Sequence, residues 1–324
     1  MISFGRDIYI MSLINRLILG HMPLVGISYQ SKEKDEEYRR RFADSSEMKN
    51  VMDAAIRMGV KRFAAASPSS SPLAPLHLDV LRGIVDEGRD IELIPCVGIP
   101  IKVGEKIIDT FRRWATYLAL ESELYPQVKR RFLDDPILNF REGWKLRLTE
   151  SKPYVKEDFE KLTIDWNSID ESLEYFLDLP VLYMEPGSET DFLTMTGRFD
   201  LLGGLVDRVK EHGFKGVLFG VHHAGVTIPN LDEELRDFNG YLTPLNPIGV
   251  MMFPTKASAE KAIKAAKRDV YAIKPLAGGR VKNWEAFSYV FNFPVEGCMV
   301  GVASVSEVEE DFKAAIEILD GLNR

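Results

Sequence analysis

Eight short apolar runs, separated by amphipathic segments, restrict the folds open to this chain more than any other feature. They cover residues 23–28, 60–66, 91–97, 180–184, 215–221, 241–245, 270–274 and 297–302. Their interiors are almost continuously apolar, which is typical of parallel strands covered on both faces. Eight strands that alternate with helices predict an α/β fold, a (β/α)8 TIM barrel forming a single domain over residues 1–324.

Helix start and stop signals support the segments between these runs. Residues 46–58 and 76–87 are followed by Gly59 and Gly88, at positions where helix C-caps are expected. Ser168 and Ser306 each begin a capping-box pattern that precedes a stripe of apolar residues. These stripes predict helices that pack against the outside of the barrel.

The alternation is interrupted once. The third run ends near Val97, whereas the helix that leads to the fourth begins near Ser168. Residues 103–165 are therefore expected to form a mainly helical insertion at the C-terminal mouth of the barrel, beginning with a helix over about 105–124. A hairpin is expected over 137–148. The many aromatic residues favour either a lid over the mouth or a contact in a homo-oligomer.

Charge and cysteine content exclude several classes of partner. Lys plus Arg number 41 and Asp plus Glu number 49, a net charge of −8 that argues against a nucleic-acid partner. Cys96 and Cys298 both lie in apolar runs and indicate reduced thiols in a cytoplasmic protein. The apolar N-terminus is interrupted by Arg6, Asp7 and Arg16, so no membrane span is expected. A small-molecule ligand remains the expected partner.

Five segments in the second half of the chain resemble the aldo-keto reductase superfamily. They are SIDESLEYFLDLPVLYM (168–184), FKGVLFGVHHAG (214–225), YLTPLNPIG (241–249), VYAIKPLAGGRV (270–281) and CMVGVASVSEVEEDF (298–312). In this order they are similar to the stretch from the third helix to the eighth strand of that family. The resemblance implies a barrel that reduces carbonyl compounds with a nicotinamide cofactor, NAD(P).

The catalytic tetrad of that family, Asp, Tyr, Lys and His, has no counterpart at the corresponding positions. The second run ends in Phe63-Ala64-Ala65-Ala66 and is followed by a serine-rich stretch, where the family has its aspartate and tyrosine. The third run ends in Cys96-Val97-Gly98 in place of the lysine, and the fourth in Tyr183-Met184-Glu185 in place of the histidine. Standard reductase chemistry is therefore not expected, and the cofactor itself stays open.

Ionisable residues at the ends of the runs are the candidate catalytic groups, because barrels carry their chemistry at the C-terminal ends of strands. Glu185 and either His222 or His223 could form an acid/base pair, and only one of two adjacent histidines can face the interior. No third ligand is evident, so no metal site is expected. Lys274 could be a catalytic amine of a lyase- or aldolase-type reaction, or pair with a carboxylate. Tyr29 could replace the missing acid.

Glycines near the last two runs predict an anion site. Gly278 and Gly279 form a turn with Arg280, while Gly301 and Ser304 end the eighth run. Glycines let backbone N–H groups approach a phosphate, and an arginine could close the site. A phosphate-bearing ligand or a nucleotide cofactor is the expectation here.

Two further residues qualify this prediction. The family's basic contacts to a 2′-phosphate are replaced by residues 303–306, followed by Glu307. Asn246, after the sixth run, could bind a ligand or cap its own loop. Three interpretations stay open: an enzyme-like barrel without standard reductase chemistry, a non-catalytic binding or scaffold barrel that uses residues 103–165, and a lysine-dependent lyase.

Overall fold

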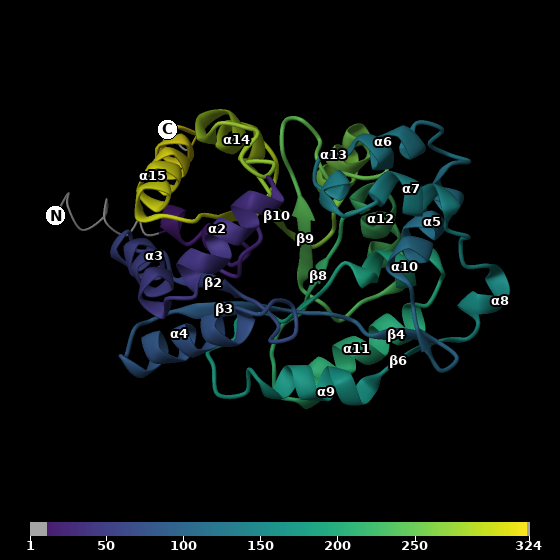
Figure 1. Cartoon of the computed structure of the whole chain (residues 1–324), viewed down its shortest axis with the longest axis horizontal. Helices are drawn as coiled ribbons and strands as arrows, with labels where there is room; N and C mark the ends of the chain where they lie inside the picture. Colours follow the sequence, from purple (N-terminus) through teal and green to yellow (C-terminus); the bar gives the residue numbers. More distant parts are fainter. Residues whose placement is uncertain (1–11, 323–324) are drawn as a thin grey trace.

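The computed structural model describes residues 12–322, and parallel strands surrounded by helices form its centre (Figure 1). Eight strands make one sheet in the order β7-β3-β2-β1-β11-β10-β9-β8, and a parallel bridge between Met184 and Val217 joins its edges. The strands are β1 (Leu17–Gly20), β2 (Arg62–Ala65), β3 (Glu92–Val97), β7 (Glu185–Pro186), β8 (Leu218–Gly220), β9 (Gly240–Pro244), β10 (Asp269–Ile273) and β11 (Gly297–Gly301). The prediction of a (β/α)8 barrel is confirmed.

Side chains from alternate positions fill the inside of the barrel. Ile18, Ile94, Leu218, Leu242 and Tyr271 form one buried cluster, and each comes from a different strand. Their neighbours along the strands point outward into a much larger core beneath the helices. The interior of the barrel is therefore filled by apolar side chains, which leaves room for a ligand at the ends of the strands.

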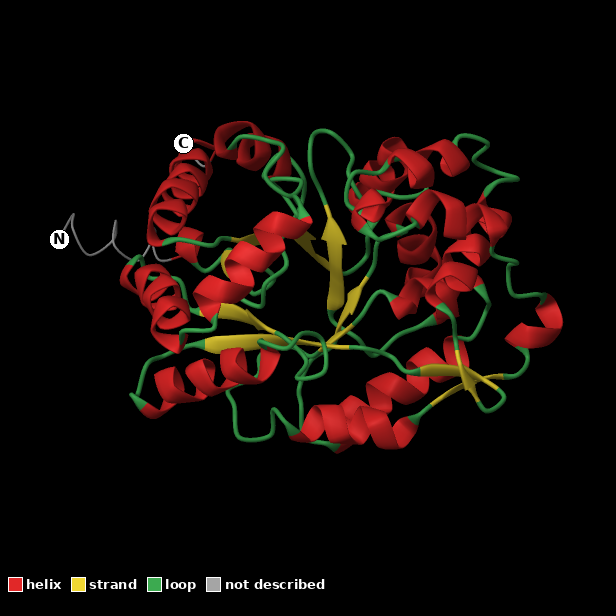
Figure 2. Ribbon diagram, in the orientation of Figure 1, coloured by secondary structure: helices red, strands yellow, loops and turns green. Residues whose placement is uncertain are grey.

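Helices surround the strands, as Figure 2 shows. Those packed around the barrel are α2 (Lys32–Phe42), α3 (Ser45–Arg57), α4 (Ala74–Asp86), α9 (Trp166–Glu174), α10 (Glu189–Met195), α11 (Phe199–Glu211), α12 (Ala224–Glu234), α13 (Lys256–Ala265), α14 (Asn283–Val290) and α15 (Val305–Leu322). Gly59 and Gly88 follow α3 and α4 with φ of 91° and 75°, as expected for glycines that end helices. The helices α9 and α15 begin at Trp166 and Val305, slightly before the predicted capping serines.

The first strand was predicted at the wrong place. Residues 23–28 form consecutive turns, in which Val25 N–H donates to the carbonyl of His21 and Gly26 N–H to that of Pro23. Pro23 has no N–H for a strand ladder, and Gly26 adopts a left-handed φ of 83°. The strand is instead the four-residue β1, which pairs with both β2 and β11. Tyr29 therefore lies on a loop beyond this strand.

The segment between β3 and α9, residues 98–165, contains four short helices, one 3-10 turn and a separate three-stranded sheet. Its elements are β4 (Ile101–Val103), β5 (Lys106–Ile107), α5 (Thr110–Glu121), α6 (Val128–Asp134), η1 (Leu138–Phe140), α7 (Trp144–Glu150), α8 (Lys156–Phe159) and β6 (Leu162–Ile164). In Figure 1, α5, α6 and α7 lie on the same side of the barrel as α12 and α13. Trp114 of α5 packs edge-on against Phe253, which ties the segment to the loop after β9.

The hairpin predicted over 137–148 does not form. Gly143, with φ of 67°, precedes the helix α7 instead of turning between two strands. Trp144 and Leu148 are four residues apart and both buried on one face of that helix, and Trp144 Nε1 donates to the carbonyl of Phe132 at 2.8 Å. Burial of this face decides the conformation in favour of a helix.

No helix within residues 12–322 is long and apolar enough to cross a membrane. Arg6 and Asp7, on which part of the expectation about the N-terminus rested, lie outside these residues.

Candidate functional site

A cavity of about 580 Å³ opens at the carboxyl ends of the barrel strands. His21, which follows β1, and Cys96, near the end of β3, line it. All four predicted catalytic residues, Tyr29, Glu185, His222 and Lys274, line it as well. The tertiary structure thus brings together in one cavity side chains that are up to 245 residues apart in the sequence (Tyr29 and Lys274).

Lys274 is at the centre of this group. Its Nζ atom lies 3.4 Å from Nε2 of His222 and 5.2 Å from the centroid of the Tyr29 ring. It forms no ion pair with a carboxylate in the part of the chain that the structure describes. A lysine ammonium without an anionic partner is uncommon in a largely buried position, and burial favours its neutral form.

The proton affinities of this group are shifted toward neutral pH. Burial lowers the pKa of Lys274 to about 8, against the opposing effect of the negative charge on Glu185. Burial also raises the pKa of Glu185 to about 7, although a hydrogen bond with Cys96 and the charge of Lys274 oppose the shift. The pKa of His222 falls well below its ordinary value, mainly through burial and then through Lys274. The amine and the carboxyl group can therefore both exchange protons near pH 7.

The backbone at two of these residues is strained. Within residues 12–322, four residues other than glycine have positive φ, and Tyr29 (59°) and Lys274 (55°) are two of them. The left-handed conformation is costly for residues with a Cβ atom, and it persists only where the surrounding packing enforces it. Such strain concentrates at functional sites, which agrees with the position of both residues in the cavity wall.

Gly220 provides the space for the Glu185 side chain. The two residues lie on β8 and β7, which are neighbours in the barrel. A Cβ atom added to Gly220 would lie 2.5 Å from Oε1 of Glu185, so a larger residue would displace the carboxyl group. Sequence reasoning missed Gly220, and its position at the end of an apolar run was the available signal.

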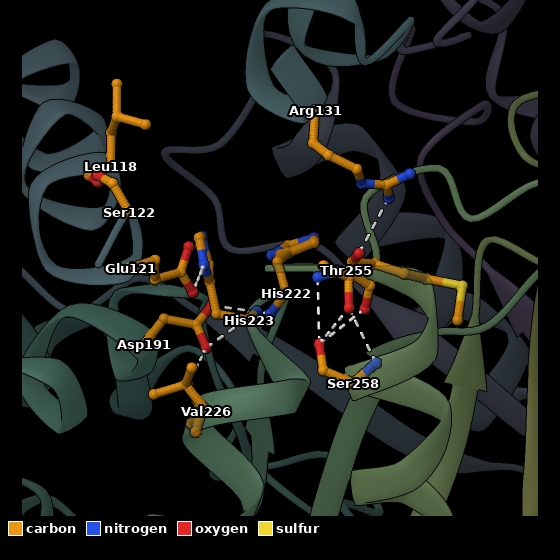
Figure 3. Close-up of polar contacts among 12 residues, drawn as sticks. Leu118, Glu121, Ser122, Arg131, Asp191, His222, His223, Val226, Thr255 and Ser258 are labelled. Atoms are coloured by element: carbon orange, nitrogen blue, oxygen red, sulfur yellow. Dashed lines mark hydrogen bonds and ion pairs between the residues drawn. The ribbon is translucent and has the colours of Figure 1, made fainter. Parts of the chain in front are cut away.

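The two adjacent histidines have different environments (Figure 3). Asp191 holds their backbone: one carboxylate oxygen accepts from His222 N–H at 2.8 Å and the other from His223 N–H at 3.3 Å and from Thr227 Oγ1 at 2.6 Å. His223 Nδ1 lies 2.8 Å from Oε1 of Glu121, the last residue of α5, and both side chains are fully buried. His222 therefore faces the cavity, while His223 connects α5 to the barrel.

The residues predicted to bind an anion are only partly brought together. Gly278, Gly279 and Gly301 line the cavity, with φ of 68° and 77° at the first two. Arg280 does not line it, since its Nη1 donates to the backbone carbonyls of Tyr29 at 2.9 Å and of two residues in its own turn. Nη1 of the guanidinium thus joins the turn to the Tyr29 loop, and this donor group is used by the chain itself.

A carboxylate of the chain occupies the end of β11. Ala303 N–H donates to Oε2 of Glu307 at 2.6 Å, and Ser304 Oγ accepts from Glu307 N–H at 3.1 Å. The first turn of α15 is thereby capped from within, at the place where the sequence suggested a phosphate. Lys282, which sequence reasoning missed, is the cation that lines this end of the cavity.

Asn246 closes its own loop. It is fully buried, its Nδ2 donates to the carbonyl of Val250 at 3.0 Å, and its Oδ1 accepts from Val250 N–H at 2.9 Å. Of the two roles considered for it, the structure therefore favours the cap. His21 was missed for a different reason: it directly follows β1, and the predicted position of that strand concealed it.

Comparison with known proteins yields similarity in structure but not in sequence. No protein-family model matches the chain, and no curated protein is significantly similar to it. A solved structure from Pseudomonas aeruginosa, described as a candidate aldo-keto reductase, aligns with 94% of this chain and 90% of its own, with a TM-score of 0.55 and 12% identity. The structure of an aldo-keto reductase from Bacillus halodurans in its holo form aligns with 95% of this chain and 91% of its own, with a TM-score of 0.48 and 12% identity.

The chain therefore has a divergent aldo-keto-reductase-like fold, as the resemblance implied. Identity of this level establishes the fold alone, because one barrel supports many chemistries and function depends on the residues at its mouth.

Proposed function

We propose that this barrel is an enzyme that acts on a small carbonyl compound, with the cavity at its mouth as the active site and Lys274 as the reacting amine. The observation that carries the proposal is a largely buried amine with a pKa of about 8 that has no ion-pair partner among residues 12–322 and lies 3.4 Å from a neutral imidazole. Lysines that form Schiff bases are activated in this way, by desolvation in an apolar pocket.

The neighbouring groups supply the proton transfers. With a pKa of about 8, roughly one tenth of Lys274 is neutral at pH 7. The nitrogen of this neutral fraction adds to the carbonyl carbon, and the neutral imidazole of His222 relays a proton from that nitrogen to the former carbonyl oxygen, which gives a carbinolamine. Glu185, protonated in part because its pKa is about 7, donates a proton to the carbinolamine hydroxyl. Water leaves, and a protonated imine remains on Lys274.

Borohydride trapping tests this proposal. Incubation with benzaldehyde and borohydride, followed by peptide mass spectrometry, should place a benzyl group on Lys274 faster than on any other lysine. The labelling rate should rise with pH around 8. The Lys282→Arg variant is the matched control, because it removes another lysine of the cavity and should leave the labelling of Lys274 unchanged. Labelling that is spread evenly over surface lysines and leaves Lys274 unmodified would refute the proposal.

A nucleotide cofactor or another phosphate-bearing ligand is the second candidate, and the glycine-rich outer end of the cavity supports it. Gly278, Gly279 and Gly301 would let a phosphate approach the backbone, with Lys282 as its counter-ion. Tyr29 beside Lys274 would then act as the acid of a reductase-like reaction without the usual tetrad. In this arrangement the nucleotide binds at the cavity wall formed after β10 and β11.

Two binding assays test the second candidate. NADH and NADPH are titrated by fluorescence, and FMN and glucose 6-phosphate are tested in thermal-shift assays. Because Glu307 occupies the backbone N–H of Ala303, we expect NADH to bind more tightly than NADPH. Lys282→Ala should weaken binding of whichever compound is accepted. Absence of binding by all four removes this candidate.

A binding or scaffold barrel is the third candidate, and apolar residues exposed on the segment 98–165 favour it. Ile107, Leu124, Leu146 and Val155 are 59%, 78%, 62% and 52% exposed. Apolar residues exposed on one segment suit a contact between copies of the chain. Deletion of the segment would uncover His223, so Leu124→Asp with Leu146→Asp is the better test. Light scattering should then show a smaller species than wild type; equal masses would contradict this candidate.

A further inference from the structure

The segment 98–165 crosses the mouth of the barrel. On one side, Arg131 of α6 donates through Nη2 to the backbone carbonyl of Met252, in the loop after β9, at 3.0 Å. On the other side, Glu142 pairs with Lys32 at 3.3 Å, where α2 begins just beyond the Tyr29 loop. The part of the segment between these anchors, which includes residue 141, therefore runs from the loop after β9 to the start of α2 beside the Tyr29 loop, just outside the residues that line the cavity.

Arg141 is the cation that this part of the segment carries. Its backbone is fixed, because its N–H donates to the carbonyl of Leu138 and its carbonyl accepts from Trp144 N–H, each at about 3.0 Å. The guanidinium lies 5.9 Å from the ring centroids of Trp114 and Trp144. Within residues 12–322 it makes no ion pair and no side-chain hydrogen bond, and the side chain is exposed. Its N–H donors are therefore open to a ligand.

The charge of Arg141 reaches the residues of the cavity. Burial is the main cause of the lowered pKa values of Lys274 and His222, and the charge of Arg141 adds a smaller effect in the same direction. Burial raises the pKa of Tyr29, and the charge of Arg141 opposes that shift. Arg113 is the other arginine close to this group, but it is paired with Glu189 of α10. A second cation near Lys274 disfavours a cationic ligand and attracts an anionic one.

We propose that Arg141 binds the carboxylate or phosphate group of a substrate whose carbonyl carbon lies at Lys274. The inference rests on the proposed lysine chemistry and adds the class of substrate to it: an aldehyde or ketone that carries an anionic group. A guanidinium suits this role because its planar pair of N–H donors matches the two oxygens of either anion. The tryptophan rings hold its planar group without consuming its donors.

Matched aldehydes test the proposal. Borohydride trapping at Lys274 is measured with benzaldehyde, 4-formylbenzoate and 4-formylphenyl phosphate, in wild type, Arg141→Ala and Arg141→Lys. We expect Arg141→Ala to lower the labelling rate with subsaturating anionic aldehydes by about tenfold more than the rate with benzaldehyde, which should fall only as far as loss of the nearby charge raises the pKa of Lys274. The lysine variant should fall in between. The anionic aldehyde whose labelling rate falls more in Arg141→Ala identifies carboxylate or phosphate as the preferred group.

Arg130→Ala is the control, since Arg130 lies in the same segment, its side chain is 88% exposed, and its one ion pair within residues 12–322 is with an exposed aspartate. Its labelling by all three aldehydes should equal that of wild type. An equal loss of all three in Arg141→Ala would overturn the proposal, because it would indicate a structural role.

Equilibrium binding separates this inference from the proposed chemistry. Benzoate and phenyl phosphate should raise the melting temperature of wild type but not of Arg141→Ala, whereas the neutral benzamide should act equally on both. If Lys274 is never labelled but this difference is found, the lysine chemistry fails and the anion site stands. If neither anion distinguishes the two proteins, the anion site is refuted whatever the labelling shows.

Discussion

Replacing Lys274 by methionine should make the protein more stable at neutral pH. Methionine keeps the length of the side chain but carries no charge. Burial lowers the pKa of Lys274 from 10.5 to about 8, and each pKa unit corresponds to about 1.4 kcal/mol. Keeping the ammonium charged in the folded state therefore costs at most about 3 kcal/mol at pH 7, which the variant recovers.

The difference in stability between Lys274→Met and wild type should depend on pH in a defined direction. Between about pH 8 and 10.5 the unfolded chain holds the lysine proton and the folded chain does not. The stability of wild type relative to the variant therefore rises with pH across this range. The advantage of Lys274→Met should shrink from about 3 kcal/mol at pH 7 to about 1.4 kcal/mol at pH 9.5.

Urea denaturation of both proteins at several pH values between 6.5 and 9.5 measures the difference, because the titrations that both proteins share largely cancel. Glu185 interacts with Lys274, so the same series in an Glu185→Gln background corrects for their coupling. A variant that is less stable than wild type throughout, or a difference that does not change with pH, would refute the assignment of Lys274 as a desolvated amine.

Three other changes have defined outcomes. Glu185→Gln should become progressively more stable than wild type as pH rises from about 4.5 to 7, by up to about 3 kcal/mol in thermal and urea unfolding, because over this range the unfolded carboxyl ionises while the buried one stays protonated; the opposite slope would contradict the raised pKa. Gly220→Ala should displace the Glu185 carboxyl group, slow aldehyde labelling of Lys274 and lower the free energy of unfolding by about 1–3 kcal/mol. Gly83→Ala is the control, because no atom lies near its new methyl group, and it should neither slow the labelling nor destabilise the protein. Asp191→Ala should cost about 3 kcal/mol in urea unfolding, since three buried donors lose their acceptor; a loss below 1 kcal/mol would mean that water replaces the carboxylate.

The catalytic candidates were partly accessible from the sequence. Lys274, His222 and Glu185 were identified because each follows or ends an apolar run, and parallel strands bring such ends together. Whether His222 or His223 faces the cavity was not accessible, since the answer depends on Glu121, which is more than a hundred positions away. Arg141 was not singled out, although its segment was expected at the barrel mouth, because the sequence does not indicate which arginine of that segment stays without a carboxylate partner.

The anion site shows the limit of local motifs. The glycines of the turn after β10, which were predicted to bind an anion, line the cavity. The same reasoning assigned Arg280 to a ligand, although its Nη1 donates to backbone carbonyls of the Tyr29 loop and of its own turn. It also could not establish that Glu307 folds back onto Ala303 N–H. A motif states which groups are available, but not whether the chain itself has already used them.

The sequence by itself determined the number of strands, the alternation with helices and hence the barrel, because apolar periodicity and helix caps act between residues close together in the chain. Only the tertiary structure decided where the first strand lies and that 137–148 contains a helix. It alone also decided which charges remain without partners at the mouth. Those outcomes depend on burial and on contacts between distant residues such as Lys32 and Glu142, or Glu121 and His223. Desolvation and pairing of this kind shift the pKa values and leave Lys274 and Arg141 open to a ligand.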